Sequence, residues 1–331
     1  MAEKTSSLKL TFIAPSKSRR SREIDVLAVG EFLCDFISHE ACDNLEKARD
    51  FHRYRGGSPA NLAANLACLG NRTALIACVG NEGLGHFLKK QLKEAGVITD
   101  YIITDPIAPT SMVILTKTQG TPDFIAYRVA DVMIKPEHIS GNVIQRSSIY
   151  HTTCFALSRE PAQSSILGGA GRASELGCHL SIDVNYAPSI WDNREEAQRI
   201  VAKYCSHGAL TKISLDDISR LFDDSTLTAE EAISRFHNWG AELVCLTKGA
   251  KGSLVSWNHG ANQEHVPGRE VLVSDATGAG DAFWAGFLTA WLDGHQPPEC
   301  ILAGSNLAAF KLKTVGPLNS RIDKSAIYVS Y

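Results

Sequence analysis

The stretch that most constrains the fold of this chain lies near its C-terminal end, over residues 271–292. A short apolar run at 271–273 enters a turn that contains Gly278 and Gly280. The turn opens into an apolar segment that is long enough for a buried helix but too short to cross a bilayer. The pattern therefore predicts a strand, a glycine turn and a helix N-terminus.

Such a helix N-terminus is a natural anion site. Its first N–H groups lack intrahelical partners and carry partial positive charge, and glycines let a ligand approach the backbone closely. Asp281 falls in the predicted first turn, where its carboxylate can accept a proton from a hydroxyl beside that anion. Phosphoryl transfer needs these two parts side by side. An acid in a first helical turn also occurs for dipole reasons alone, so this simpler interpretation stays open.

Composition excludes several classes of function. The 331 residues include 33 basic and 36 acidic side chains, a net charge of −3 that argues against nucleic acid as a partner. The 9 cysteines show no paired CxxC spacing, which favours buried thiols in a reducing compartment, and we expect a cytoplasmic protein without membrane spans. Residues 1–23 are rich in Ser, Lys and Arg and are expected to form a disordered tail.

Residues 24–331 show strands that alternate with helices, as in an open parallel sheet covered on both faces. Apolar strands are predicted at 25–31, 73–80, 149–153, 179–183 and 210–214. Two further segments, about 32–56 and 109–130, lack helical periodicity and are predicted to form a small separate sheet, with a hairpin turn at 119–122. The predicted class is α/β, a doubly wound and mostly parallel sheet with a small β-sheet beside it.

A second informative stretch is Arg55-Gly-Gly-Ser-Pro-Ala-Asn61, which precedes a helix that ends at Gly70. Ser58 suits the N-cap and Pro59 the first helical position. Asn61 lies in the first turn of this helix, so capping alone can account for it. Asp35 follows the first predicted strand, where open α/β sheets place ligand contacts, although a plain turn carboxylate is the alternative.

Two strings in this sequence resemble signatures of one family. Asp275-Ala-Thr-Gly-Ala-Gly-Asp281 is similar to Asp-Thr-Thr-Gly-Ala-Gly-Asp of the ribokinase-like (PfkB) carbohydrate kinases, with Ala276 as a departure. The Gly56 to Asn61 string resembles the Gly-Gly-Ala-Pro-Ala-Asn form found in fructokinases. The resemblance implies the ribokinase-like fold, in which the small sheet is a lid over the sugar and often a dimer contact. It also implies that Asp281 is the catalytic base and that the amides of Gly278, Ala279 and Gly280 form the anion hole.

The resemblance also assigns sugar contacts. They fall on Asp35, Gly56, Gly57, Asn61, Asp183 and, through a Tyr-Arg…Ala-Asp segment, Arg128. For Arg128 a plain cation at the lid edge is an equal alternative. Ala187 replaces an Arg that is usual in the family segment Asp-x-Asn-x-Arg, so a phosphate or sugar-acid contact is lost or comes from elsewhere, with Arg159 and Arg194 as candidates.

The remaining assignments concern ATP and metal ions. The Thr-x-Gly-x-x-Gly segment and a residue beside the adenine place nucleotide contacts at Thr247, Gly249, Gly252 and Asn306. Magnesium is expected near Asp217, which matches a family Glu, although a helix-capping acid is as good an account. In many relatives a monovalent cation sits behind the anion hole near the positions of Asp275 and Thr277, and this implies activation by K+.

The resemblance thus predicts ATP-dependent phosphorylation of a sugar primary hydroxyl, with fructose or a related ketohexose as substrate. A kinase of 2-keto-3-deoxygluconate or another sugar is one alternative. A non-catalytic sugar- or nucleotide-binding protein that keeps the fold is another, and Ala276, Ala187 and Asp217 are the departures that favour it. The expected partners are ATP, a small sugar and a second copy of the chain through the lid.

Overall fold

In the computed structural model of the chain, residues 18–20, 22–118, 123–314, 316–318 and 320–330 are described. The strands are β1 Ile24–Val29, β2 Leu33–Ala41, β3 Phe51–Gly56, β4 Thr73–Gly80, β5 Ile102–Asp105, β6 Met112–Lys117, β7 Phe124–Tyr127, β8 Ser147–Thr153, β9 His179–Asp183, β10 Leu210–Ser214, β11 Leu243–Thr247, β12 Ser253–Trp257 and β13 Asn262–Val266. The helices are α1 Ser58–Cys68, α2 Gly83–Glu94, α3 Gly141–Gln145, α4 Ala162–Glu175, α5 Arg194–Cys205, α6 Leu215–Phe222, α7 Ala229–Asn238, α8 Ala279–Asp293 and α9 Pro297–Leu312.

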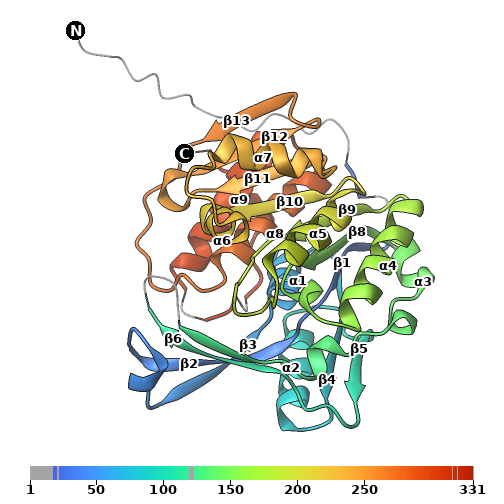
Figure 1. Cartoon of the computed structure of the whole chain (residues 1–331), viewed down its shortest axis with the longest axis vertical. Coiled ribbons are helices and arrows are strands. Elements are labelled where there is room, and N and C mark those ends of the chain that lie inside the picture. Colours follow the sequence, from blue (N-terminus) through green and yellow to red (C-terminus); the bar gives the residue numbers. More distant parts are fainter. Residues whose placement is uncertain (1–17, 21, 119–122, 315, 319, 331) are drawn as a thin grey trace.

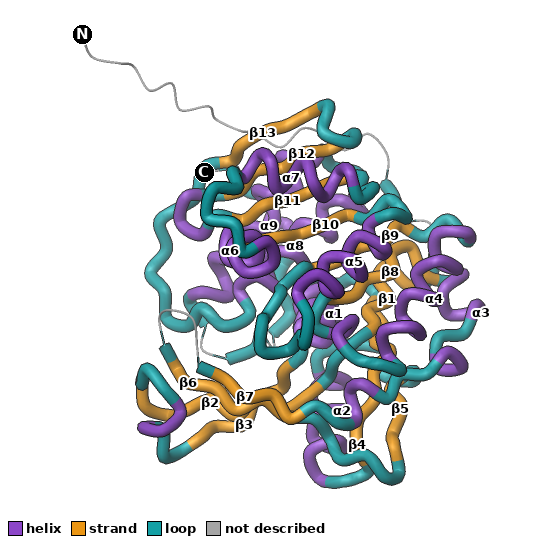
Figure 2. Tube along the Cα trace, in the orientation of Figure 1, coloured by secondary structure: helices purple, strands orange, loops and turns teal. Residues whose placement is uncertain are grey.

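The main sheet has the strand order β13-β12-β11-β10-β9-β8-β1-β4-β5 within the described chain. Strands β11, β10, β9, β8, β1, β4 and β5 pair in parallel, and β12 and β13 add an antiparallel edge. The chain winds outward in both directions from β1, so β1 and β8 flank a topological switch point. The predicted doubly wound, mostly parallel sheet is confirmed, and Figures 1 and 2 show its helices in layers on the two faces.

Alternation along the strands accounts for these two layers, because successive side chains point to opposite faces of a sheet. On β1, Leu27 and Val29 belong to the core that includes residues of α4, α5, α6 and α7. Val26 packs with residues of α1, α8 and α9, and Ala28 with residues of α1 and α2. The strands are buried on both faces and therefore read as continuous apolar runs.

The small sheet has the order β3-β2-β6-β7 and draws its strands from the two predicted segments. We call it the lid. Strands β2 and β6 pair in parallel, whereas β6 and β7 form the antiparallel hairpin expected from the sequence. The hairpin turn at 119–122 lies outside the described residues. In Figure 1 the lid extends from the lower left of the main sheet.

Two expectations need correction. Residues 271–273 form no strand; Leu272 and Val273 are 89% and 58% exposed, and the chain crosses here from the edge strand β13 to α8. Three apolar residues cannot define a strand when no neighbouring strand pairs with them. The second correction concerns Ser58, which begins α1 instead of capping it.

The predicted disordered tail falls largely outside the described residues, since only 18–20 and 22 precede residue 23 in them. Those residues contact the body of the protein. Arg19 stacks on Trp291 at 3.9 Å, and Arg20 binds Asp25 and Asp293. No described helix is both long and apolar enough to cross a membrane.

Candidate active site

The N-terminus of α8 has the geometry that the glycine turn predicted. Gly278 is the N-cap residue, with a φ of 74°, a conformation that favours glycine because a side chain there would be strained. Ala279, Gly280 and Asp281 make up the first turn of the helix. The Ala279 amide donates to the Ala276 carbonyl at 3.2 Å, a turn bond that holds the loop in shape. The loop therefore lies at the positive end of a long buried helix.

Asp281 is held by the N-terminus of α1. Its Oδ1 accepts a hydrogen bond from Ser58 Oγ at 2.7 Å, and its Oδ2 accepts one from Asn61 Nδ2 at 3.1 Å. Burial raises the pKa of Asp281 to about 6, although the Ser58 hydroxyl opposes the shift. Asn61 therefore binds the carboxylate of Asp281 instead of capping its own helix. This contact orients the carboxylate of a candidate base.

Glu31 fixes the position of α1 relative to the main sheet. It follows β1, and its carboxyl group accepts hydrogen bonds from the Ser58 amide at 3.1 Å and from Thr153 Oγ1 at 2.8 Å. Burial raises the pKa of Glu31 to about 8. The ends of β1 and β8 are thereby connected to the helix that carries Asn61.

Asp35 comes from the lid. It lies on β2 opposite the end of β3, and a Cβ atom placed on Gly56 would lie 2.4 Å from its carboxylate. Only glycine leaves room for this side chain. Burial, and then the nearby Asp281 carboxylate, raise the pKa of Asp35 to about 7. Gly57 follows as the N-cap residue of α1.

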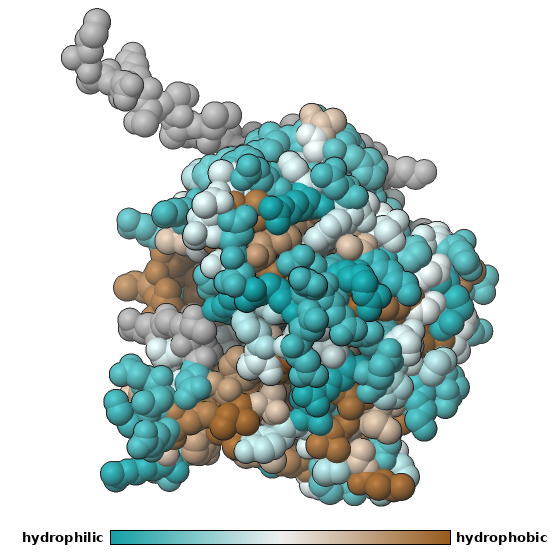
Figure 3. All heavy atoms as spheres, viewed as in Figure 1, coloured by the Kyte–Doolittle hydropathy of each residue, from teal (hydrophilic) through white to brown (hydrophobic). Residues whose placement is uncertain are grey.

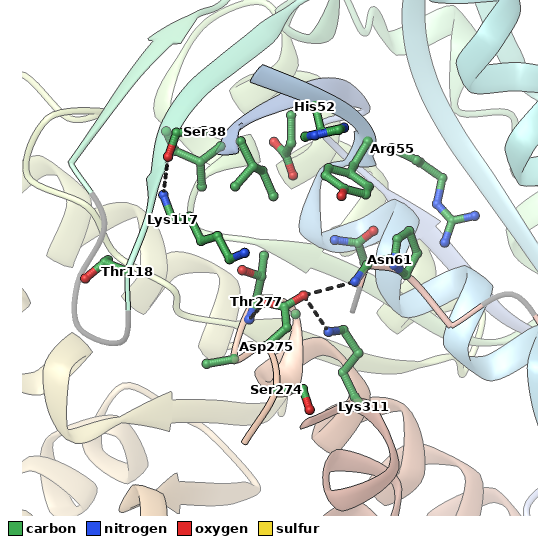
Figure 4. A pocket seen from close by; sticks show the side chains of 18 of the residues that line it. Ser38, His52, Arg55, Asn61, Lys117, Thr118, Ser274, Asp275, Thr277 and Lys311 are labelled. Carbon is green, nitrogen blue, oxygen red and sulfur yellow. Dashed lines mark hydrogen bonds and ion pairs between the residues drawn. The ribbon is translucent and has the colours of Figure 1, made fainter. Parts of the chain in front are cut away.

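A cavity of about 430 Å³ lies between the lid and the body of the protein. The lid lines it with Asp35, Ser38, His52, Tyr54 and Lys117, among others, and the body with Asn61, Asp275, Thr277, Gly278 and Lys311. Figure 4 shows the Lys117 side chain extending from the end of β6 into this space. The volume suits a small ligand, since ligand pockets span roughly 300–1,000 Å³.

A buried cation stands next to residues 275–281 at the N-terminus of α8, which we call the anion loop. Lys212 Nζ binds both carboxylate oxygens of Asp183 at 2.8 Å, and a Cβ atom on Gly280 would lie 3.3 Å from that ammonium. Burial alone would lower the pKa of Lys212, but Asp183 and Asp217 outweigh this effect and raise it. Lys212 lies within the predicted strand 210–214, and no function was predicted for it. An isolated Lys in a buried parallel strand is the signal that identifies it, since such a charge needs a partner.

Asp217 is buried at the start of α6. Its Oδ1 accepts the Tyr186 amide at 3.0 Å, and its Oδ2 accepts the Ser214 amide at 2.8 Å and the Ser214 hydroxyl at 2.6 Å. This is a capping box, so the simpler of the two predicted roles is present. Burial raises the pKa of Asp217. A magnesium role for Asp217 stays a prediction.

Asp275 connects the start of the anion loop to the end of α9. Its Oδ1 accepts the Thr277 amide at 2.9 Å, and its Oδ2 accepts the Gly316 amide at 3.1 Å and Lys311 Nζ at 3.3 Å. Burial would raise the pKa of Asp275, but these donors outweigh it and the pKa is lowered. Figure 4 shows Lys311 directed at this carboxylate.

The predicted nucleotide contacts do not line this cavity. Thr247 ends β11 and donates to the Ile213 carbonyl at 3.4 Å, and Gly249 begins a short 3-10 turn. A Cβ atom on Gly252 would lie 2.2 Å from the Val266 carbonyl oxygen, so packing accounts for that glycine. Asn306 is buried and donates to the carbonyls of Ile327 and Val329 at 3.0 Å. Nucleotide binding by these four residues stays a prediction.

Arg128 has partners inside the protein. Its side chain is 2% exposed and pairs with Asp131, donates to the Phe155 carbonyl at 3.0 Å and stacks over the Phe155 ring at 4.2 Å. In this structure Arg128 thus has Asp131 and Phe155 as partners, and a sugar contact by Arg128 stays a prediction. Of the arginines considered in place of Ala187, Arg194 pairs with Asp223 at 2.7 Å.

Fold and site together define an α/β protein with a glycine turn at a helix N-terminus and an oriented carboxylate beside a lidded cavity. The sequence profile described as "pfkB family carbohydrate kinase" matches residues 23–324. The chain therefore belongs to the pfkB family of carbohydrate kinases and is a sugar kinase by family. Kinases of this family use ATP and a divalent metal.

Individual relatives agree with this membership. An ATP-dependent 6-phosphofructokinase of Thermoanaerobacterium thermosaccharolyticum is 33% identical over 310 residues, which cover 94% of each protein. A Halothermothrix orenii fructokinase structure is 32% identical with a TM-score of 0.74, covering 85% of this chain and 98% of that one. A double-mutant fructokinase of Vibrio cholerae O395, solved in a fructose, ADP and potassium ion bound form, is 25% identical with a TM-score of 0.81, covering 93% and 99%.

Proposed function

We propose that this protein transfers the γ-phosphoryl group of ATP to a primary hydroxyl of a ketohexose, with fructose as the first candidate. One observation carries the proposal: the Asp281 carboxylate, oriented by Ser58 and Asn61, lies in the first turn of α8 behind the Gly278 turn. A base and an anion site are thus adjacent, as phosphoryl transfer requires.

In the proposed reaction the sugar hydroxyl loses its proton to Asp281 as its oxygen bonds to the γ-phosphorus. The bond from that phosphorus to the bridging oxygen breaks, and ADP leaves. The amides of Gly278, Ala279 and Gly280 stabilise the charge on the transferred group, together with the Lys212 ammonium beside Gly280. Asp35 accepts hydrogen bonds from sugar hydroxyls and so places one of them at the base.

Magnesium is part of this proposal because its preferred ligands are present. Magnesium prefers oxygen ligands and keeps several waters, and Asp183 and Asp217 put carboxylates beside Lys212 at the edge of the anion loop. Asp217 would hold the ion through water, because its oxygens already accept three hydrogen bonds. Both oxygens of Asp183 are already bound by the Lys212 ammonium. When bound, the ion neutralises charge on the β- and γ-phosphates.

A sugar that already carries a phosphate is a second candidate, favoured by the cations of the cavity. Lys117 extends into it, and Arg55 lines it as a 3% exposed side chain. Within the described chain no guanidinium nitrogen of Arg55 has a hydrogen-bond partner, and burial lowers its pKa to about 10. A buried cation without a partner is stabilised by an anion of the ligand. The 33% identical relative is named as a 6-phosphofructokinase, which agrees with this candidate.

A sugar panel tests both candidates. ADP release is measured with ATP, magnesium and fructose, fructose 6-phosphate or 2-keto-3-deoxygluconate. A higher kcat/KM for fructose supports the first candidate. A higher value for the phosphate, lost in Lys117→Ala but kept in the exposed control Lys90→Ala, supports the second. If the protein binds ATP but releases no ADP in the presence of any of the sugars, the non-catalytic alternative is supported.

The lid also supports a homodimer. Ile125 and Tyr127 are each 48% exposed and lie on alternate positions of the edge strand β7, and Phe51 on β3 is 37% exposed. Figure 3 shows apolar surface over the lid. Covering such side chains with a second lid removes apolar area from water. Sedimentation equilibrium is expected to show a dimer for the wild type and a monomer for Tyr127→Glu. A monomeric wild type would contradict this assembly.

A further inference from the structure

Lys311 places its ammonium group directly behind the anion loop. The side chain is 5% exposed and comes from the last turn of α9. Its Nζ lies 3.3 Å from Asp275 Oδ2 and 3.2 Å from the Thr314 carbonyl oxygen. A Cβ atom on Gly278 would lie 3.7 Å from Lys311 Cε, so the side chain also packs under the N-cap of α8.

This is the place that the resemblance assigned to a monovalent cation, near Asp275 and Thr277. One structural neighbour was solved with a potassium ion bound. Potassium is held by oxygen ligands that replace its hydration shell. Here a carboxylate and a carbonyl already face an ammonium, and a second cation would meet like charge at short range in a buried setting. The residues present therefore do not fit a bound potassium ion.

We propose that the Lys311 ammonium is a built-in substitute for the monovalent cation, so that this protein does not require potassium. Lys311 acts as a positioning residue through Asp275, whose other contacts are the amides of Thr277 and Gly316. The ammonium thereby fixes the loop that ends at Gly278 against the end of α9. For its kinetic consequence the inference rests on the proposed phosphoryl transfer.

Cation binding is tested first, without any substrate. Thermal unfolding is followed in potassium chloride and in tetramethylammonium chloride at equal ionic strength, because an ion that binds only the folded state raises Tm. Equal Tm values are expected for the wild type. Lys311→Ala removes the ammonium and leaves two oxygens facing a space, and its Tm is expected to rise specifically with potassium. A potassium-specific rise in the wild type would overturn the proposal.

Kinetics provide the second test. The wild type is expected to have equal kcat in the two salts. Lys311→Ala is expected to lose about tenfold in kcat in tetramethylammonium, the scale of a lost charge-assisted hydrogen bond, and to recover in potassium or ammonium. Lys311→Met fills the space without a charge and should not recover. Lys313→Ala, an exposed lysine after the same helix, should behave as the wild type.

The outcomes separate this inference from the proposed function. Potassium-dependent turnover by the wild type, or a Lys311→Ala variant that keeps full kcat in both salts, contradicts the role of Lys311. If no sugar is phosphorylated at all, the proposed function fails, and the Tm comparison still decides whether Lys311 excludes potassium.

Discussion

Asp275 and Asp281 stand at the two ends of the same anion loop, yet their surroundings are opposite. Asp275 receives two amides and an ammonium, and its pKa is lowered. Asp281 receives a hydroxyl and a side-chain amide in a buried setting, and its pKa is raised to about 6. Neutral donors leave a carboxylate basic enough to take a proton, whereas a cation makes it a permanent anion. The comparison indicates a base at one end and an anchor at the other.

The largest effect is expected from Asp281→Asn. The amide cannot accept the hydroxyl proton, so kcat should fall by about 10²–10⁴-fold with little change in KM. Steady-state kinetics with the best sugar of the panel measure this loss. The variant should still fold at pH 8, since it removes a carboxylate whose charge is disfavoured by burial. A kcat above a tenth of wild type would remove Asp281 from the role of base.

Asp35→Ala is expected to act on the sugar rather than on the chemical step. Loss of the carboxylate leaves sugar hydroxyls unpaired, at a cost of roughly 1–3 kcal/mol in kcat/KM. The loss should appear as a higher KM for the sugar, with the KM for ATP unchanged. If the KM for ATP rises instead, Asp35 is not a sugar contact.

The pH dependence of kcat/KM gives the next effect. A base acts when deprotonated, so the raised pKa of Asp281 implies that activity is lost as pH falls through about 6. One pH unit below this pKa, kcat/KM should be about tenfold lower than its plateau at higher pH. Asp35, with a pKa near 7, adds to the same acidic limb if its ionised form binds the sugar. A flat profile between pH 5 and 8 would contradict the assignment of Asp281.

The effect of Asp275→Asn on stability should be the smallest change in free energy among these predictions. The amide keeps an acceptor oxygen but loses its charge beside Lys311, which should lower the free energy of unfolding by about 1 kcal/mol at pH 7. The pKa of Asp275 is lowered in the folded state, so its stabilisation is present above the unfolded pKa and is lost as pH falls through the lower folded pKa. Urea unfolding of the wild type and the variant, at pH 7 and in acid, measures the difference in their free energies of unfolding. A difference that grows in acid would contradict the contrast drawn between Asp275 and Asp281.

Local patterns in the sequence were sufficient for much of this molecule. Apolar runs of about five residues predicted the buried strands, and the Gly278 turn predicted the α8 N-terminus, because both depend on neighbours in the chain. The prediction of a strand at 271–273 was wrong, because an apolar run forms a strand only where a neighbouring strand pairs with it. Contacts between distant segments had no local signal: Ser58 meets Asp281 across 223 positions, and Lys311 meets Asp275 across 36.

The origin of the two walls of the cavity has a consequence for how such a protein diversifies. Asp35 and Lys117 belong to the lid, in two insertions between strands of the main sheet, whereas Asp281 and Lys212 belong to the helix and strand of the body. Under the proposed roles, the sugar contact Asp35 and the base Asp281 therefore lie in separate stretches of the chain. Exchange of the two lid segments for those of a relative is a route to a new sugar preference that leaves the phosphoryl-transfer apparatus intact.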